Sequence, residues 1–278
     1  MPDTVDDLKN AIIDNKFKRE KNKILEKKLF IFDVDGTIKI GNIKIPDIDK
    51  FFKKITNMGA SYCLLSNNTS KTKFEHVKNI SKVIGINFNE NSLYTPLDQV
   101  IEYLRTNSIN NIFVIGTDSV IEYFESNDFT IDEVNPDSVI VTFDTSLNYD
   151  KLVTASRLLV DPSIKFILSN IDKRCPTEFG FIPDAGSIAD MLRVTTDHEI
   201  NYTTGKPSKG MIDTILKQKN ITRDSCVFFG DRLYTDIRMG NNASIMTVLV
   251  LTGETKLKDL SVEDVNDMLI LKNYKELL

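Results

Sequence analysis

Two aspartates lie two positions apart where an apolar segment of the chain ends. Residues 29–32 read Leu-Phe-Ile-Phe, and Asp33, Asp35 and Gly36 follow within four positions. A short apolar, aromatic-rich run predicts a central strand of a covered sheet, and open α/β sheets bind ligands at the carboxyl ends of such strands. Carboxylates beside a buried strand cost free energy unless a cation or hydrogen bonds compensate them. The pattern therefore favours a cation site, with an ordinary Asp-Gly turn as the alternative.

Two further segments could bind a phosphate group. Ser66, Asn67 and Asn68 follow a second apolar run, 60–65. A small hydroxyl and consecutive backbone N–H groups at such a position can hold phosphate oxygens. Lys206 lies between a glycine and a proline, which predicts a point charge on a loop before a helix. Taken alone, each segment can also be an ordinary solvated loop.

A fourth segment repeats the pattern of the first. Residues 226–229 are apolar, and Gly230 and Asp231 come directly after them, with Asp236 near the start of a predicted helix. Asp33 and Asp231, at the ends of two strands, can share one magnesium ion, because this hard cation takes oxygen ligands. Two unrelated strand-end turns are the alternative, which the occurrence of all four segments in this order disfavours.

With these four segments in order, the chain resembles the haloacid dehalogenase superfamily, in its NagD-like (p-nitrophenylphosphatase-like) phosphatase branch with a large inserted cap. The similarity covers roughly residues 28 to 260. The matching segments are 33–37, 66–68, 205–207 and 230–236, with further similarity at 139–141, 149–152, 248–253, Asn170 and Asp172. The resemblance implies an α/β fold with a Rossmann-like parallel-sheet core and an inserted α/β cap domain.

The resemblance also implies a Mg²⁺-dependent phosphatase that hydrolyses small phosphomonoesters, such as sugar, polyol or nucleotide phosphates. Asp33 would form an aspartyl-phosphate, and Asp35 would protonate the leaving alkoxide and then activate water. The implied residues are Asp33, Asp35 and Lys206 for catalysis; Ser66, Asn67, Asn68, Asp184, Arg232 and Thr235 for substrate binding; Asp33, Asp35 (through its main-chain carbonyl) and Asp231 for the metal; and Asp236 in support, behind Lys206 or the metal ligands. A phosphomutase or a non-catalytic phosphometabolite sensor on the same scaffold is the alternative, whereas Asp35 argues against a dehalogenase.

One segment departs from the pattern of the branch. The branch usually reads Pro-Gly-x-Gly-Ser or Pro-Gly-x-Gly-Ala in the cap, whereas residues 183–187 read Pro-Asp-Ala-Gly-Ser. In the family this segment approaches the substrate, so Asp184 could repel acidic substrates and accept hydrogen bonds from hydroxyl groups. Alternatively, Asp184 points to solvent and only caps the following helix.

Composition sets limits on partners and location. The formal net charge of −5 argues against a nucleic-acid binder, and no apolar stretch approaches the length of a membrane span. Three cysteines without paired spacing suggest reduced thiols. We therefore expect a cytoplasmic protein, a monomer or homodimer, whose partner is a small phosphorylated metabolite.

Strands alternate with helices along most of the chain, which predicts right-handed βαβ units and parallel sheets. We expect a helical extension over 1–28, a core domain from 29–107 and 200–278, and an inserted cap over 108–199. Within the extension, apolar residues at helical spacing predict a helix over 5–28 that docks on the core, with an oligomer contact as the alternative. The predicted core strands are 29–34, 60–66, 93–94, 226–229 and 246–251, and the predicted core helices are 47–58, 70–83, 97–105, 208–218 and 236–242. In the cap we expect strands at 112–115, 138–143 and 165–168 and helices at 118–126, 149–159 and after Gly186.

Overall fold

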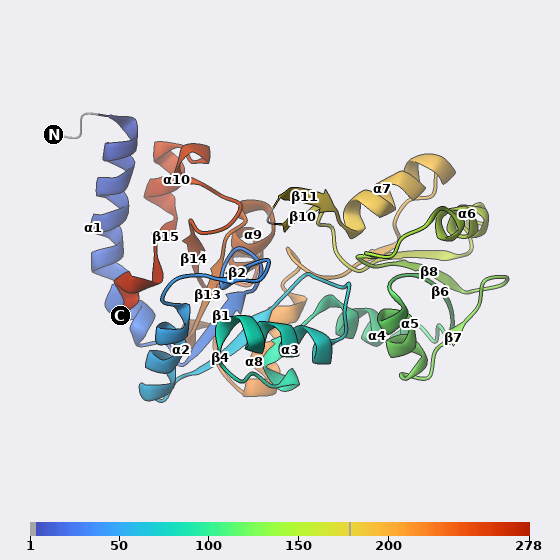
Figure 1. Ribbon diagram of the computed structural model, residues 1–278, viewed down its shortest axis with the longest axis horizontal. Coiled ribbons are helices and arrows are strands. Elements are labelled where there is room, and N and C mark those ends of the chain that lie inside the picture. Colours follow the sequence, from blue (N-terminus) through green and yellow to red (C-terminus); the bar gives the residue numbers. More distant parts are fainter. Residues whose placement is uncertain (1–3, 178) are drawn as a thin grey trace. The chain divides into compact units, whose positions relative to one another are not determined.

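A computed structural model describes residues 4–177 and 179–278, which form two compact units (Figure 1). The first unit runs from the N-terminal helix to Ser66 and also contains Val77–Tyr94 and Pro207–Leu278. The second unit contains Asn67–His76 and Thr95–Lys206. Its limits are therefore wider than those of the predicted cap, 108–199, and the predicted domain boundaries stay a prediction.

The first unit is built on a six-stranded sheet in which all neighbouring strands are parallel. The strand order is β15-β14-β13-β1-β4-β5. The bounds are β1 (Leu29–Asp33), β4 (Ser61–Leu65), β5 (Leu93–Tyr94), β13 (Cys226–Gly230), β14 (Met246–Val250) and β15 (Leu269–Leu271). A small antiparallel hairpin, β2 (Lys39–Ile40) and β3 (Ile43–Lys44), follows β1. The central strands β1 and β13 are neighbours, so their carboxyl ends lie side by side.

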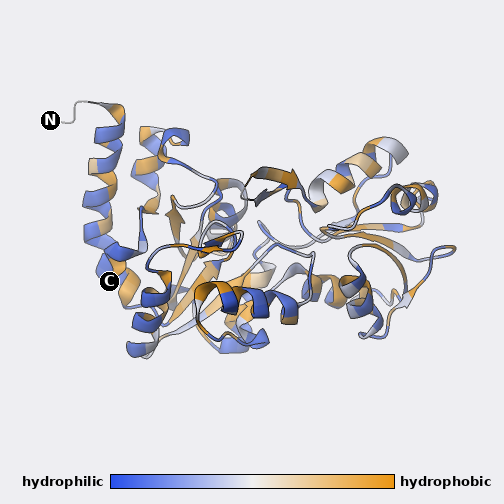
Figure 2. Cartoon of the chain, in the orientation of Figure 1, coloured by the Kyte–Doolittle hydropathy of each residue, from blue (hydrophilic) through white to orange (hydrophobic). Residues whose placement is uncertain are grey.

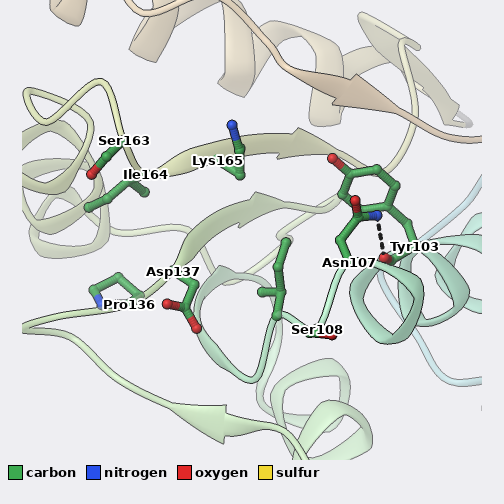
Figure 3. A pocket seen from close by; sticks show the side chains of 9 residues that line it. Tyr103, Asn107, Ser108, Pro136, Asp137, Ser163, Ile164 and Lys165 are labelled. Atoms are coloured by element: carbon green, nitrogen blue, oxygen red, sulfur yellow. Dashed lines mark hydrogen bonds between the residues drawn. The ribbon is translucent and has the colours of Figure 1, made fainter.

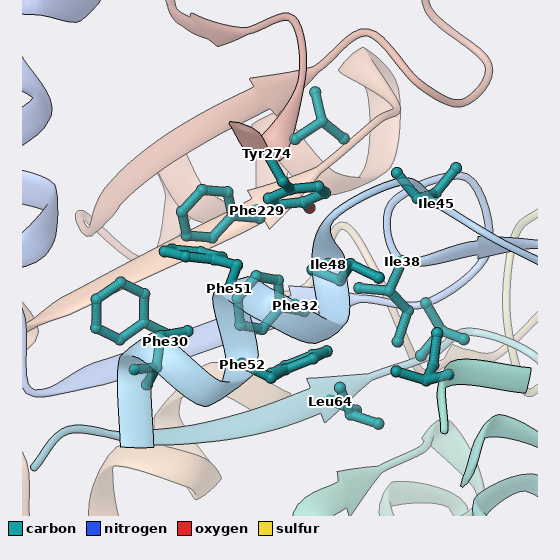
Figure 4. Close-up of a cluster of buried hydrophobic side chains, with 14 of the residues drawn as sticks. Phe30, Phe32, Ile38, Ile45, Ile48, Phe51, Phe52, Leu64, Phe229 and Tyr274 are labelled. Carbon is teal, nitrogen blue, oxygen red and sulfur yellow. The ribbon is translucent and has the colours of Figure 1, made fainter. Parts of the chain in front are cut away.

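Both faces of this sheet are covered because alternate residues of each strand point to opposite sides. Phe30 and Phe32 face one apolar cluster, and Leu29 and Ile31 face another. Figure 2 shows the central strands as largely hydrophobic. On the first face, Phe32 stacks on Phe229 with ring centroids 4.9 Å apart, within an aromatic cluster that includes Tyr274 (Figure 4).

Amphipathic helices supply the cover. Helix α2 (Ile48–Asn57) buries Ile48, Phe51, Phe52 and Ile55, which lie on one helix face at spacings of three and four. It shares the first cluster with α3 (Lys73–Ile84), whereas α8 (Gly210–Lys219) and α9 (Arg238–Asn242) cover the opposite face. The other helical segments are α10 (Val262–Asp267), the π-helix η3 (Leu233–Ile237), and the 3₁₀ turns η1 (Glu90–Ser92), η2 (Arg223–Ser225), η4 (Leu257–Asp259) and η5 (Tyr274–Leu277).

The N-terminal helix α1 (Val5–Leu25) docks beside the edge strand β15 and helix α10 (Figure 1). It buries Ile13, Phe17 and Ile24, and its Asp14 forms an ion pair with Lys272. The expectation that this helix docks on the core is thus confirmed, and an oligomer contact stays untested.

The second unit is also a covered parallel sheet, with the order β12-β9-β8-β6-β7. Its strands are β6 (Asn111–Ile115), β7 (Thr130–Ile131), β8 (Ser138–Val141), β9 (Lys165–Leu168) and β12 (Tyr202–Thr203). Helices α4 (Pro96–Thr106) and α5 (Asp118–Glu125) pack on one face, and α6 (Tyr149–Leu158) and α7 (Ala185–Thr196) pack on the other. An antiparallel hairpin, β10 (Arg174–Thr177) and β11 (Gly180–Pro183), precedes α7.

Most predicted elements occur near their expected positions, and the differences are local. The helix predicted from residue 236 begins as the π-helix η3 three residues earlier, and α3 begins three residues later than predicted. The predictions omitted the two hairpins, β7, β12, β15 and α10, which are short elements with little room for a periodic pattern. Within residues 4–177 and 179–278, no helix has both the length and the apolar character that a membrane span needs.

Candidate active site

Three buried aspartates meet at the carboxyl edge of the first unit's sheet. Asp33 is the last residue of β1, Asp231 follows β13 directly, and Asp236 lies in η3. Each of these carboxylates offers one oxygen atom, and the three oxygens all lie within 4.8 Å of one another. The three residues are at most 5% exposed. The prediction that the strand ends of β1 and β13 bring Asp33 and Asp231 together is confirmed.

Glycines allow this close approach. A Cβ atom at Gly36 would lie 2.3 Å from Asp231 Oδ2, and the φ of Gly36 is +102°, a conformation that other residues rarely adopt. A Cβ atom at Gly253 would lie only 1.9 Å from the same oxygen. The carboxylate of Asp231 is therefore enclosed between two segments of bare backbone.

Backbone hydrogen bonds fix the loop that carries Asp231. Asp236 Oδ2 accepts from the N–H groups of Asp231 and Arg232, each at 3.0 Å. Asp231 Oδ2 in turn accepts from the N–H group of Glu254 at 2.5 Å. The other oxygen, Asp231 Oδ1, is buried and accepts no hydrogen bond from the described residues. Asp236 therefore shapes the loop, and Asp231 keeps one oxygen for a further partner.

Burial and neighbouring carboxylates disfavour the charged form of Asp231. Burial, followed by the charges of Asp33 and Asp236, raises the pKa of Asp231 well above its usual value, against the smaller opposing effects of Arg232 and the Glu254 N–H group. Burial, with smaller contributions from Asp33 and Asp231, also raises the pKa of Tyr274. A divalent cation would relieve this repulsion, and an all-oxygen donor set suits a hard cation. The residues therefore fit a divalent metal.

Asp35 lies just beyond this cluster and is paired with a cation. Its carboxylate forms an ion pair with Lys39 Nζ, and the two side chains are 23% and 11% exposed. The N–H group of Gly36 also donates to the carbonyl of Lys39 at 2.7 Å, which joins the β2–β3 hairpin to the segment that carries Asp35. Any role of Asp35 in proton transfer would therefore take place next to a lysine.

The predicted phosphate-binding residues belong to both units. Ser66 follows β4 in the first unit, and its N–H group donates to the carbonyl of Tyr94 at 3.0 Å. In the second unit, Asn67 Oδ1 accepts from the N–H group of Lys206 at 2.8 Å, and Asn170 Nδ2 donates to the Asn67 carbonyl at 3.0 Å. The structure thus brings Asn67 and Lys206, 139 positions apart in the sequence, into direct contact.

The neighbouring Asn68 is held within its own loop. Asn68 Oδ1 accepts from the N–H group and the hydroxyl of Ser70, and its carbonyl contacts a ring nitrogen of His76. The predicted contacts of Ser66, Asn67 and Asn68 with a phosphate group stay predictions.

The remaining predicted substrate residues are all buried. Asp184 is the N-cap of α7, where Oδ1 accepts from the N–H group of Ala185 at 2.6 Å. Asp184 is buried, so the capping alternative describes its contacts but its orientation toward solvent was wrong. Arg232 Nε lies 3.2 Å from Glu254 Oε2, and Thr235 is buried within η3. Contacts of Asp184, Arg232 and Thr235 with a substrate stay predictions.

A separate cavity of about 360 Å³ lies in the second unit (Figure 3). Its lining includes Tyr103, Asn107, Asp137 and Lys165. These residues surround the amino ends of β6, β8 and β9, whereas parallel sheets bind ligands at the carboxyl ends of their strands. We therefore assign the candidate site to the acid cluster and not to this cavity.

Comparisons with known proteins agree with this geometry. Residues 30–130 match the family model described as haloacid dehalogenase-like hydrolase, and residues 203–277 match a second, related hydrolase model. The ribonucleotide monophosphatase NagD of Escherichia coli (strain K12) is 30% identical over 230 residues, which cover 83% of this chain and 90% of the relative. The chain belongs to the haloacid dehalogenase-like hydrolases.

Solved structures place it more narrowly within this family. The crystal structure of a 4-nitrophenylphosphatase from Thermotoga maritima has a TM-score of 0.84 and 32% identity, and the match covers 92% of this chain and 97% of that one. A putative NagD protein follows with a TM-score of 0.82 and 30% identity, covering 91% and 98%. The chain lies in the NagD-like branch, with a parallel-sheet core and an inserted cap, and is a phosphoric monoester hydrolase.

Four residues next to the acid cluster of Asp33, Asp231 and Asp236 had no role in the sequence predictions. Lys39 pairs with Asp35, Thr252 and Glu254 contact the segments that carry Asp35 and Asp231, and the hydroxyl of the buried Tyr274 donates to the Thr37 carbonyl at 3.2 Å. The apolar run 248–251 ends in Thr252 and Gly253, so the strand-end pattern could have identified that loop. No local pattern identifies Tyr274, because its partner lies 237 positions away.

Proposed function

We propose that this enzyme is a Mg²⁺-dependent phosphatase that hydrolyses small phosphomonoesters through an aspartyl-phosphate on Asp33. The observation that carries the proposal is the cluster of Asp33, Asp231 and Asp236, whose carboxylate oxygens lie within 4.8 Å of one another at the end of the central strands. Mg²⁺ would be held by the side chains of Asp33 and Asp231 and by the main-chain carbonyl of Asp35. When bound, it supplies positive charge for the phosphate oxygens.

Two carboxylates carry the chemistry in this proposal. An oxygen of Asp33 attacks phosphorus in line, a P–O bond to the enzyme forms, and the ester P–O bond breaks. Asp35 donates a proton to the departing alkoxide and later takes one from the water that attacks the phosphorus of the aspartyl-phosphate. The P–O bond to Asp33 then breaks, which releases inorganic phosphate and restores the carboxylate. General acid–base help of this kind is worth about 10²–10⁴-fold in rate.

The surrounding residues divide into supporting groups. Asp236 holds the loop of Asp231 through two backbone N–H groups, which agrees with a role beside the metal ligands. Lys206, Ser66, Asn67 and Asn68 keep the roles at the phosphate that the family resemblance implies. The substrate-binding roles of Arg232 and Thr235 rest on the family resemblance alone. Arg232 already pairs with Glu254.

The substrate class is that of small phosphorylated metabolites: sugar, polyol or nucleotide phosphates. The relatives carry names for different substrates, among them a ribonucleotide monophosphatase of Escherichia coli and a glycerol-3-phosphate phosphatase of Mus musculus. These names support phosphomonoesters as a class without favouring one member. Cytoplasmic location and a monomeric or homodimeric state stay predictions.

Phosphate release from p-nitrophenyl phosphate tests the proposal. Activity should require Mg²⁺, disappear with EDTA, and return when Mg²⁺ is restored. Asp33→Asn should abolish turnover, and Asp35→Asn should reduce it about 10²–10⁴-fold. Substantial activity in Asp33→Asn would refute the covalent mechanism. Transfer of phosphate to a second hydroxyl of a sugar phosphate, without release of inorganic phosphate, would identify a mutase.

A further inference from the structure

A loop after β14 ties the two acid-bearing segments of the first unit together. Thr252 Oγ1 donates to the Gly36 carbonyl at 2.6 Å, so it contacts the segment after Asp33 and Asp35. The N–H groups of Glu254 and Thr255 donate to the side chain and the carbonyl of Asp231, at 2.5 and 3.2 Å. This loop therefore sets the position of Asp231 relative to the end of β1.

The same loop carries a buried ion pair next to the acid cluster. Arg232 Nε lies 3.2 Å from Glu254 Oε2, and the two side chains are only 8% and 15% exposed. Arg232 directly follows Asp231, and the backbone N–H groups of both residues donate to Oδ2 of Asp236, each at 3.0 Å. A permanent cation is thus placed within electrostatic reach of carboxylates that would otherwise attract it.

An arginine so placed can pair with a carboxylate of the acid cluster as well as with Glu254. Its planar guanidinium group binds carboxylates through two parallel hydrogen bonds, and it cannot lose its charge. If it turned toward Asp231 and Asp33, it would occupy the oxygens that a divalent cation needs. Glu254 offers it a carboxylate on the side of the Thr252–Thr255 loop instead.

We propose that Glu254 is a positioning residue that keeps Arg232 away from the acid cluster and so leaves Asp33 and Asp231 to Mg²⁺. The inference deepens the proposed function and rests on its metal site. A role in stability alone would be a weak explanation for the pair, because buried ion pairs add little to stability compared with apolar residues of the same size. The two explanations predict different results when both charges are removed.

Calorimetric titration of the purified enzyme with Mg²⁺ tests this competition directly. Glu254→Gln releases the guanidinium group and should weaken Mg²⁺ binding about tenfold or more. Glu254→Gln combined with Arg232→Gln removes the competitor as well, and should return the dissociation constant to within about threefold of wild type. Thermal melts without Mg²⁺ establish that each variant is folded. Arg232→Gln alone serves as a second variant, and should bind Mg²⁺ at least as tightly as wild type.

The outcomes separate this inference from the proposed function. If wild type binds Mg²⁺ and Asp231→Asn does not, the metal site stands. The inference is then overturned if Glu254→Gln binds like wild type, or if the double variant binds as weakly as Glu254→Gln. If Glu254→Gln does not fold, weaker Mg²⁺ binding by Arg232→Gln would overturn it instead. A wild type that binds no Mg²⁺ would reject the metal site, and the inference with it.

Discussion

Gly253→Ala is expected to disable the acid cluster through a single added carbon. Its Cβ atom would lie 1.9 Å from Oδ2 of Asp231, and real Cβ atoms essentially never come within 3.0 Å of another heavy atom. The carboxylate must therefore move by about 1 Å, a misplacement that costs on the order of 10²-fold in catalysis. This movement would also disturb the 2.5 Å hydrogen bond from the Glu254 N–H group. We expect kcat/KM to fall by about 10²-fold.

Gly240→Ala is a matched control within the same unit. Its Cβ atom would also lie 1.9 Å from a side-chain oxygen, Thr247 Oγ1, and its contacts include none of the acid cluster. Overpacking of this kind typically costs about 1–3 kcal/mol in stability, which corresponds to about 2–4 °C in Tm per kcal/mol for chains near this size. Both variants should therefore lose similar amounts of stability.

Two measurements decide the comparison: Mg²⁺-dependent hydrolysis of p-nitrophenyl phosphate, and thermal melting without Mg²⁺. Gly253→Ala should lose activity far beyond its loss of stability, whereas Gly240→Ala should keep kcat/KM within about threefold of wild type. The reasoning is refuted if Gly253→Ala keeps its activity, or if the two variants lose activity equally.

Three further predictions concern pH, the Asp35 ion pair and the helix cap. Because the pKa of Asp231 is raised in the folded state, its contribution to stability is complete below the ordinary pKa of 3.8 and is lost as pH rises through the raised pKa. Thermal melts in EDTA should therefore show stability falling with pH more steeply in wild type than in Asp231→Asn. Equal slopes for the two proteins would contradict this prediction. Lys39→Met removes the cation beside Asp35 and should change kcat more than KM in steady-state assays; an unchanged kcat would show that the pair is dispensable. Asp184→Ala should lower the free energy of unfolding by about 0.5–2 kcal/mol in urea titrations, whereas Asp184→Asn should keep most of it, and equal losses would argue against capping.

The acid cluster could be predicted from the sequence because each of its strand-end aspartates is marked by the residues directly before it. Asp33 and Asp231 each follow an apolar strand, and the carboxyl ends of parallel strands meet at one edge of a sheet. Ordered motifs then led to the family, and the family led to an α/β core with a cap. The docked helix α1 could be predicted for the same reason, since Ile13, Phe17 and Ile24 follow a helical period.

The contacts that complete the site could not be predicted, because they depend on how distant segments pack. Arg232 and Glu254 are 22 positions apart and share no motif, and Lys39 lies on a strand of only two residues. For Asp184 the sequence did mark the residue, but it allowed two different roles. Its sequence position allowed both a substrate contact and a helix cap, and only the folded structure shows that its Oδ1 accepts from the Ala185 N–H group.

The docking of α1 also bears on how the edges of the six-stranded sheet are covered. A sheet edge presents unpaired N–H and C=O groups, on which a strand of another molecule can add and start aggregation. At one edge of the six-stranded sheet, β5 has only two residues and offers little backbone for such pairing. At the other edge, α1 packs beside β15. Helix α1 thus covers this edge of the sheet. A chain without α1 would expose the edge strand β15 together with the apolar surface that Ile13 and Phe17 now cover.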